Sequence, residues 1–253
     1  MLYAVYEILK RYGGIRWLFP GEDGEYFTAR PTIAVPAQDT VHNPTSRIRT
    51  MFFESCNINS PLRDTRDWMV RNNMVVSTYS RYFVWPEIER LCRERGAVVF
   101  DGLHAFNPLL FGGYGIRTHK EQVAFAEELY ETHPAVFPLI NGERVKILPG
   151  MHRFQPCTSH PKTTELMLAT LEHWIKQWGQ DSIFVIGNND GTSWCQCEHC
   201  RALDPPEEKK IRSVATRYWT FVNGLVTRAL EKYPDAELYG WAYKNFHQPP
   251  AGL

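Results

Sequence analysis

The sequence has no excess charge of either sign. Lys and Arg together number 28 among its 253 residues, and Asp and Glu also number 28. Proteins that bind nucleic acid or an anionic membrane surface typically carry a basic excess, so we expect neither partner. The sequence also lacks an apolar run of transmembrane length, and its N-terminus lacks the basic segment and small-residue cleavage site of a signal peptide. These absences leave the compartment open.

Cysteine is scarce, and half of it lies in one motif. Of the six cysteines, Cys195, Cys197 and Cys200 form C-x-C-x-x-C, with His199 inside the motif. This clustering is unlike the disulfide framework of a small secreted domain. Three thiols and an imidazole suit a soft tetrahedral metal such as zinc, with Cys157 or His199 as the further ligand. A disulfide and packed free thiols are the alternatives. We expect no cofactor to be required for catalysis.

Aromatic side chains, in contrast, are abundant. They make up 13% of the chain, including 8 Trp and 12 Tyr. Aromatic faces pack against pyranose rings, so this content favours a sugar-binding cleft and a carbohydrate partner. A large aromatic core would give the same count, and the hydrophobic content of 43% is enough for a substantial core.

Strand and helix patterns alternate from residue 47 onward. Strands are expected at 47–53, 74–77, 97–100, 183–186 and 237–243, and helices at 63–71, 85–94, 121–132, 163–177 and 211–232. Asn141-Gly142 predicts a hairpin turn. The alternation predicts a parallel α/β architecture, either a doubly wound sheet or a TIM barrel. Because a complete barrel needs eight strands, a barrel built from these five would be a partial (β/α)8 barrel.

The first 46 residues do not predict a core of their own. A helix at 1–11 and a short strand at 15–19 are followed by a segment rich in Pro. We therefore interpret residues 1–30 as the tail of a small α/β domain, 31–46 as a linker, and 47–253 as an incomplete TIM-type barrel. On this interpretation the missing N- and C-terminal parts of the domain are further partners, and the chain alone is expected to be inactive.

A candidate site follows the strand at 183–186. This apolar run leads into Asn188, Asn189, Asp190 and Gly191. Ligands of parallel α/β proteins bind at the carboxyl ends of the strands, which makes Asp190 the best candidate for a catalytic group. The alternative is an ordinary turn, because Asn, Asp and Gly dominate turns.

The chain resembles the uncharacterised domain family numbered 4838 almost from end to end. The stretches that carry the resemblance are LYAVYEILKRYGGIRWLFPGEDGE, HPAVFPLINGERV, NDGTSWCQCEHCRAL, WTFVNGLV and WAYKNFHQPP. That family is related to the glycoside hydrolase barrels of families 20, 67 and 84, and part of it is classed as family 163 endo-β-N-acetylglucosaminidases. The resemblance implies a barrel that acts on a glycan containing an amino sugar or a uronic acid. Relatives of this kind are often exported.

A looser resemblance to family 20 hexosaminidases implies two catalytic positions. In IGNND, Asp190 takes the position of the general acid, and Asn189 takes that of the carboxylate that orients the substrate acetamide. Partial burial is then expected to raise the pKa of Asp190, so that it is protonated near neutral pH. Asn189 departs from the pattern because an amide cannot stabilise a cationic oxazolinium. Another carboxylate, such as Glu54 or Asp101, is one alternative, and a non-catalytic carbohydrate-binding module is the other.

The same resemblance implies residues that hold the sugar. RTMFFE lies where those enzymes have a first strand with a sugar-binding Arg, which corresponds to Arg49. FDGLHAF places Asp101 and His104 near the sugar, and Trp241 and Tyr243 lie near a tyrosine that binds the acetamide. Each of these residues also has an ordinary role open to it in the core or in the scaffold.

Overall fold

The structure is a computed structural model that describes residues 2–42, 45–46, 49, 62–74, 76–77, 99–101, 104–113, 116–179 and 183–250. The helix expected at 85–94 lies outside these residues, as does the strand expected at 47–53 apart from Arg49. The chain divides into two compact units, residues 1–101 and 102–253, and each is described by itself. The domain boundaries given above stay a prediction.

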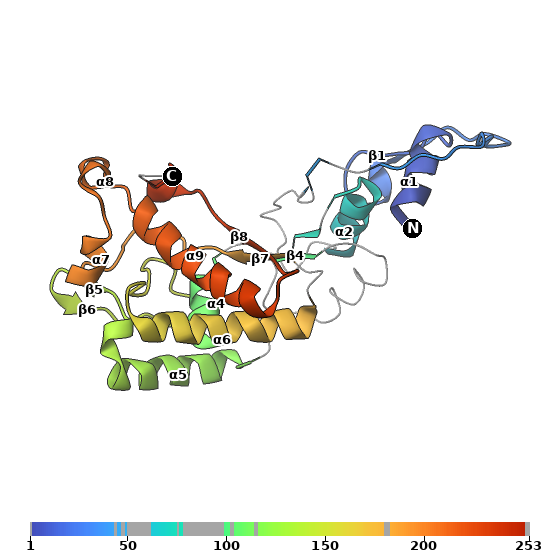
Figure 1. Ribbon diagram of the computed structural model, residues 1–253. Coiled ribbons are helices and arrows are strands. Elements are labelled where there is room, and N and C mark those ends of the chain that lie inside the picture. Colours follow the sequence, from blue (N-terminus) through green and yellow to red (C-terminus); the bar gives the residue numbers. More distant parts are fainter. Residues whose placement is uncertain are drawn as a thin grey trace. The chain divides into compact units, whose positions relative to one another are not determined.

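The first unit has helices and short strands among its described residues (Figure 1). They are α1 (Leu2–Arg11), β1 (Arg16–Trp17), the 3-10 turn Glu22–Gly24, β2 (Glu25–Tyr26), α2 (Leu62–Arg71), β3 (Val76–Ser77) and β4 (Val99–Asp101). β1 and β2 are antiparallel, whereas β3 and β4 are parallel. Trp17 in β1 contacts both α1 and α2. Its ring meets that of Tyr6 in α1 edge-on at 5.4 Å, and its carbonyl accepts a hydrogen bond from Trp68 Nε1 in α2 at 2.9 Å.

The second unit contains a longer series of elements (Figure 1). They are α4 (Phe106–Phe111), α5 (His119–Thr132), the 3-10 turn Pro134–Val136, β5 (Leu139–Ile140), β6 (Glu143–Arg144), α6 (Pro161–Trp178), β7 (Ile183–Ile186), α7 (Glu198–Ala202), α8 (Pro206–Ile211), α9 (Ala215–Lys232), β8 (Glu237–Gly240) and the 3-10 turn Lys244–Phe246. With parallel strand pairs and long helices, the chain has the mixed α/β structure that its sequence predicts.

β7 and β8 form a parallel pair that positions the candidate site. Their register runs from Ile183 opposite Glu237 to Ile186 opposite Gly240, so the strands expected at 183–186 and 237–243 are neighbours. All four residues of β7 are buried, as expected for a strand whose two faces are both covered. β8 ends at Gly240 and not at Tyr243, because the backbone N–H of Trp241 leaves the ladder and donates to Tyr218 Oη at 3.0 Å.

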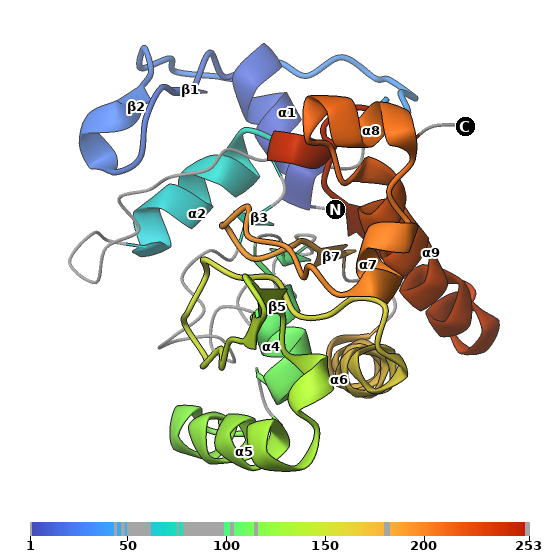
Figure 2. The same cartoon turned by 90° about the vertical axis from the view of Figure 1, so that its left-hand side faces the viewer.

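The core of the second unit lies between β7 and the helices. α6 packs against both α4 and α9, and Figure 2 looks along the axis of α6. The largest fully buried side chains here are Phe106, Leu109, Leu110, Phe111, Phe137, Ile147, Met167, Leu171, Trp174, Phe184, Tyr218 and Phe246. The Tyr218 hydroxyl donates to the carbonyl of Ile186 at 3.1 Å, and the backbone N–H of Phe106 donates to Gly187 O at 3.0 Å. α9 and α4 are thereby tied to the carboxyl end of β7.

Several element boundaries follow from local capping chemistry. The predicted hairpin is confirmed, with Asn141 and Gly142 both at positive φ as its tight turn requires. α5 begins two residues before the prediction because Thr118 forms a capping box with Glu121. The long helix predicted over 211–232 is confirmed from Ala215 to its end at Lys232. Its predicted start is wrong, because Arg212 adopts φ 57° and ends α8.

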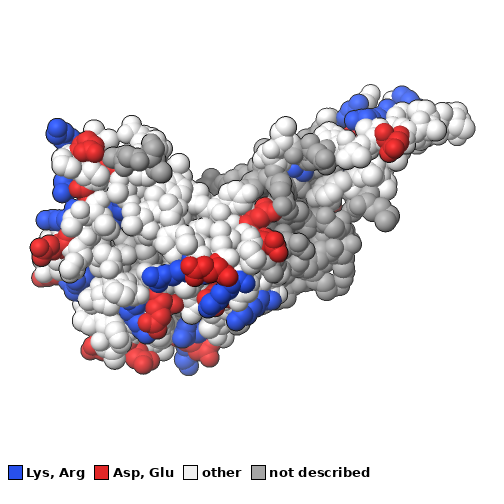
Figure 3. All heavy atoms as spheres, viewed as in Figure 1, with Lys and Arg blue, Asp and Glu red and all other residues white. Residues whose placement is uncertain are grey.

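No closed barrel forms among the described residues. No helix in these ranges combines the length and apolar character needed to cross a membrane. On the face drawn in Figure 3, basic and acidic side chains are interspersed and neither sign gathers into a large patch. The absence of a nucleic-acid or membrane partner stays a prediction.

Candidate functional site

Asp190 lies beyond the carboxyl end of β7, with polar groups from other segments around its carboxylate. Lys244 Nζ is 2.8 Å from Asp190 Oδ1 and also contacts the Asp190 carbonyl. The Tyr243 hydroxyl donates to the same Oδ1 at 3.2 Å, and His104 Nε2 lies 3.6 Å from it. The Asp190 side chain remains 55% exposed, so it is open to a ligand. The segments after β7 and β8 and the start of α4 therefore meet at one carboxylate.

The orientation of His104 is fixed by a backbone carbonyl. Its Nδ1 lies 2.7 Å from the carbonyl oxygen of Asn188, which can only accept a hydrogen bond, so Nδ1 carries the proton and Nε2 faces Asp190. The His104 ring also meets Trp241 edge-on at 5.2 Å, and Trp241 meets Tyr243 edge-on at 5.6 Å. Of the predicted site residues, the structure thus brings together Asp190, His104, Trp241 and Tyr243.

The electrostatic environment of Asp190 contradicts the expected raised pKa. The hydrogen bond from Lys244 lowers the pKa of Asp190 below its ordinary value, and the nearby His104 and Tyr243 act in the same direction. Burial opposes this shift but does not overcome it, since the side chain is largely open to water. Asp190 is therefore a carboxylate at neutral pH and not a protonated acid.

Lys244 belongs to the candidate site, and the sequence analysis did not identify it. It adopts φ 48°, a conformation that a residue with a side chain seldom takes outside special sites. This turn of the backbone, directly after Tyr243, carries the ammonium group to Asp190. A weak signal was present in the sequence, because Lys244 is the first charged residue after the last strand. Its backbone conformation could not be read from that signal.

Asn189 serves the scaffold in this structure. Its side chain is buried, and Nδ2 donates to Asn107 Oδ1 and to the Phe154 carbonyl, both at 2.8 Å. Its Oδ1 accepts from the backbone N–H of Asn107 at 3.0 Å, and its own backbone N–H donates to Gln155 Oε1 at 2.8 Å. Both amide hydrogens of the side chain are used within the protein. The predicted catalytic role of Asn189 stays a prediction, whereas its role in holding the loop is visible.

Gly191 allows a close approach that holds the Asp190 loop in place. Its backbone N–H donates to the His152 carbonyl at 2.6 Å. A Cβ at this position would lie only 1.8 Å from the carbonyl oxygen of Arg153, so a residue with a side chain does not fit. The loop after β7 is therefore packed backbone to backbone against residues 152–154. Neither this segment nor Gln155 was identified from the sequence, because no local pattern marks them.

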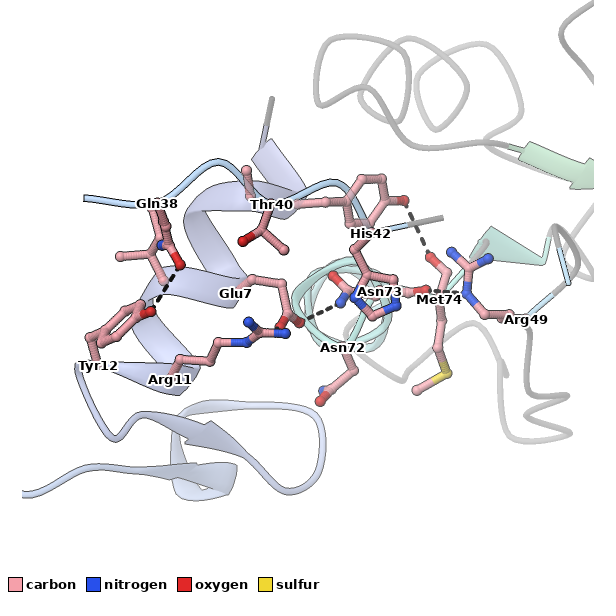
Figure 4. Close-up of a pocket in the computed structure, with 13 residues that line it drawn as sticks. Glu7, Arg11, Tyr12, Gln38, Thr40, His42, Arg49, Asn72, Asn73 and Met74 are labelled. Atoms are coloured by element: carbon pink, nitrogen blue, oxygen red, sulfur yellow. Dashed lines mark hydrogen bonds and ion pairs between the residues drawn. The ribbon is translucent and has the colours of Figure 1, made fainter. Parts of the chain in front are cut away.

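The other predicted sugar-binding residues belong to the first unit. Arg49 lines a cavity of about 730 Å³, whose other lining residues include Glu7, Arg11, His42 and Asn73 (Figure 4). Its Nε donates to the Asn73 carbonyl at 2.9 Å, so the guanidinium is held by backbone groups.

Asp101 ends β4, and its side chain is not among those that the structure describes. Glu54 also falls outside the described residues. The sugar-binding roles of Arg49 and Asp101 stay predictions. Asp190 is not among the residues that line the cavity of the first unit.

A second constellation is formed by cysteines. Cys157, Cys195, Cys197 and Cys200 are all buried, and their Sγ atoms lie within 4.8 Å of one another. Cys157 Sγ is 3.7 Å from the Sγ atoms of both Cys197 and Cys200, far longer than a disulfide bond, so these thiols are free. Of the two residues considered as the further ligand, the structure brings Cys157 to the motif, whereas His199 is exposed.

These observations define a mixed α/β protein with a polar and aromatic site at the carboxyl ends of two parallel strands. Residues 19–253 match the family model described as "Domain of unknown function (DUF4838)", so the chain belongs to that family, as its sequence signatures indicate. No curated protein and no solved structure matches the chain.

Proposed function

We propose that the chain is a glycoside hydrolase-like domain that acts on a glycan containing an amino sugar, a β-N-acetylglucosaminide, or a uronic acid. The observation that supports this proposal is the convergence of Asp190, His104, Trp241 and Tyr243 at the ends of β7 and β8. A sugar offers hydroxyl and amide donors at its edges and C–H groups on its faces. A carboxylate beside two aromatic rings complements both kinds of group.

The proposed scaffold is a partial (β/α)8 barrel. The parallel pairings within each unit, β3 with β4 and β7 with β8, support it, as do the helices that separate β7 from β8 in the chain. In such barrels the groups that contact the substrate follow the carboxyl ends of the strands. Asp190, Trp241 and Tyr243 follow this rule in the second unit.

The ionised state of Asp190 changes the role proposed for it. A carboxylate accepts hydrogen bonds from sugar hydroxyls and from the N–H of an acetamide, but it has no proton to give to a leaving group. It also repels a second carboxylate, which favours an amino sugar over a uronic acid as its immediate contact. Asp190 is therefore proposed to orient the sugar and to stabilise positive charge that develops on it.

His104 is the proposed proton donor in place of Asp190. Its Nε2 faces the carboxylate, while Nδ1 is held by the Asn188 carbonyl. Histidine is the residue type most often used to exchange protons near neutral pH, and a neighbouring carboxylate stabilises its charged form. The 3.6 Å separation from Asp190 Oδ1 is longer than a hydrogen bond, so the two groups attract each other as an ion pair when His104 is protonated.

A non-catalytic carbohydrate-binding module is the second candidate. It is favoured by Asn189, whose amide hydrogens are both donated within the protein where the related enzymes have a carboxylate. It is also favoured by the lowered pKa of Asp190. On this alternative, the same four residues bind the sugar and no bond is broken.

The test compares hydrolysis of an aryl N-acetyl-β-glucosaminide with binding of a chitin oligosaccharide. For an enzyme, Asp190→Asn and His104→Gln should each lower kcat/KM by about 10²–10⁴-fold. Asp235→Asn, an exposed carboxyl before the amino end of β8, should leave it unchanged. Binding without turnover by a full-length version would favour the binding module. Unchanged turnover in Asp190→Asn would remove Asp190 from the mechanism.

A further inference from the structure

We propose that Cys157, Cys195, Cys197 and Cys200 bind one zinc ion in a closed tetrahedral site with a structural role. The proposal is independent of the glycan function, because it rests on a separate set of side chains. It starts from the finding that all four thiols are buried and come together within 4.8 Å.

The spacing of the sulfur atoms fits a tetrahedron around zinc. With Zn–S bonds of about 2.3 Å, the edges of a regular tetrahedron are about 3.8 Å long. Cys157 Sγ lies 3.7 Å from the Sγ atoms of both Cys197 and Cys200. A zinc ion can therefore be placed among the sulfur atoms with small adjustments and no rearrangement of the backbone. Disulfide formation, in contrast, requires a pair to close to about 2.0 Å.

The ligand set defines the role of the ion. Four thiolates fill every position of tetrahedral zinc and leave none for water or substrate, which is the arrangement of structural sites. The cluster is buried at all four residues, and the partly buried Leu139 packs against it from β5. A catalytic role for this metal is therefore not part of the proposal.

Donors around Cys195 are suited to a thiolate. The backbone N–H of Leu139 donates to Cys195 Sγ at 3.3 Å, and the Arg144 guanidinium approaches it at 3.9 Å. A zinc ion with four thiolates carries a net charge of about −2, and N–H donors and a nearby cation offset such a charge. Ser159 Oγ lies 3.1 Å from Cys200 Sγ and adds a third polar group. Four neutral thiols packed as a hydrophobic cluster would have no need of these donors.

The ion would join two segments that support the candidate site. Cys157 ends the segment that contains His152, Cys195 and Cys197 end the loop that contains Asp190, and Cys200 lies in α7 directly after that loop. These segments already meet at the Phe154–Ser193 bridge and through the hydrogen bond from Gln155 N to Ser193 O at 3.0 Å. Neither segment is a regular helix or strand at this point, so a metal crosslink supplies rigidity that the secondary structure does not.

The experiment measures metal in the complete chain purified under reducing conditions. We expect about one zinc per chain by elemental analysis, and reconstitution with Co²⁺ should give thiolate-to-cobalt charge transfer with tetrahedral d–d bands. Cys157→Ser should lose this spectrum and most of the zinc, whereas His199→Ala, inside the same motif, should keep both. If Cys157→Ser does not fold, the zinc content and the cobalt spectrum of the unaltered chain still decide.

The proposal would be overturned if the unaltered chain contained no zinc and showed no thiolate–cobalt absorption, or if iron occupied the site in place of zinc. Alternatively, His199→Ala would lose the metal while Cys157→Ser kept it, which would assign a different ligand set.

Discussion

Lys244 Nζ lies 2.8 Å from Asp190 Oδ1, and this contact favours the charged forms of both groups in the candidate site. The two residues are 54 positions apart in the chain, and they meet because β7 and β8 are parallel neighbours whose carboxyl ends lie together. The pair lowers the pKa of Asp190 and raises that of Lys244. Both groups are therefore charged at neutral pH.

Replacing Lys244 should change the titration of Asp190. In Lys244→Met the largest cause of the lowered pKa is removed, so the pKa of Asp190 should rise. The measurement is an NMR titration of the Asp190 carboxyl carbon. Lys232→Met is the matched control, because Lys232 pairs with Glu172. Equal titration of Asp190 in Lys244→Met and in the unaltered chain would contradict the account.

The same pair implies a small dependence of stability on pH. Because folding lowers the pKa of Asp190, its ionised form stabilises the folded state above the unfolded pKa, and this contribution is lost as the pH falls through the folded value. The contribution is small because more than half of the Asp190 side chain is exposed. Lys244→Met should remove it, which urea unfolding between neutral and acidic pH would detect.

The close approach at Gly191 predicts a large effect of a single methyl group. Gly191→Ala places a Cβ against the Arg153 carbonyl and should destabilise the fold by about 1–3 kcal/mol. Gly224→Ala is the control, because a Cβ there meets nothing within 4 Å and the residue lies in the exposed part of α9. It should stabilise by about 0.5–1 kcal/mol. Denaturant midpoints compare the two, and equal changes would refute the packing argument.

The buried pair of Asp204 and Arg217 predicts a second contrast in stability. Arg217 Nε donates to Asp204 Oδ1 at 2.9 Å, and its Nη1 donates to the Cys195 carbonyl at 2.7 Å. Asp204→Asn leaves the buried guanidinium without its counter-charge and should cost about 3–5 kcal/mol. Glu172→Gln removes the partner of the exposed Lys232, whose ion pair is screened by water, and should cost much less. Similar losses from both changes would be inconsistent with these burial assignments.

The parts of the fold that the sequence predicted are those specified by local patterns. The apolar run at 183–186 has the bounds of β7, and Asn141-Gly142 forms the predicted hairpin turn. The start of α9 was missed because it depends on the left-handed conformation of Arg212. An arginine in the sequence does not indicate a left-handed backbone conformation, whereas a glycine would.

The residues of the site that follow strand ends could be predicted from the sequence. The contacts between segments far apart in the sequence could not. Asp190 follows a strand, and that rule was sufficient to select it. Tyr243 was selected through the resemblance to family 20 hexosaminidases. The contributions of Lys244 and Gln155 depend on backbone turns and on partners tens of residues away. The sign of the Asp190 pKa shift was missed for the same reason, since burial was foreseen and the ammonium group of Lys244 was not.

The central claim is that Asp190 and Trp241 bind an amino sugar, and saturation-transfer NMR with a chitin oligosaccharide tests it most directly. With the unaltered chain, we expect saturation to be transferred to the acetamide and ring protons of the oligosaccharide. This transfer should be lost with Asp190→Ala and with Trp241→Ala, and it should be retained with Asp235→Asn. Absence of saturation in the unaltered chain, or equal saturation in Asp190→Ala, would contradict the claim.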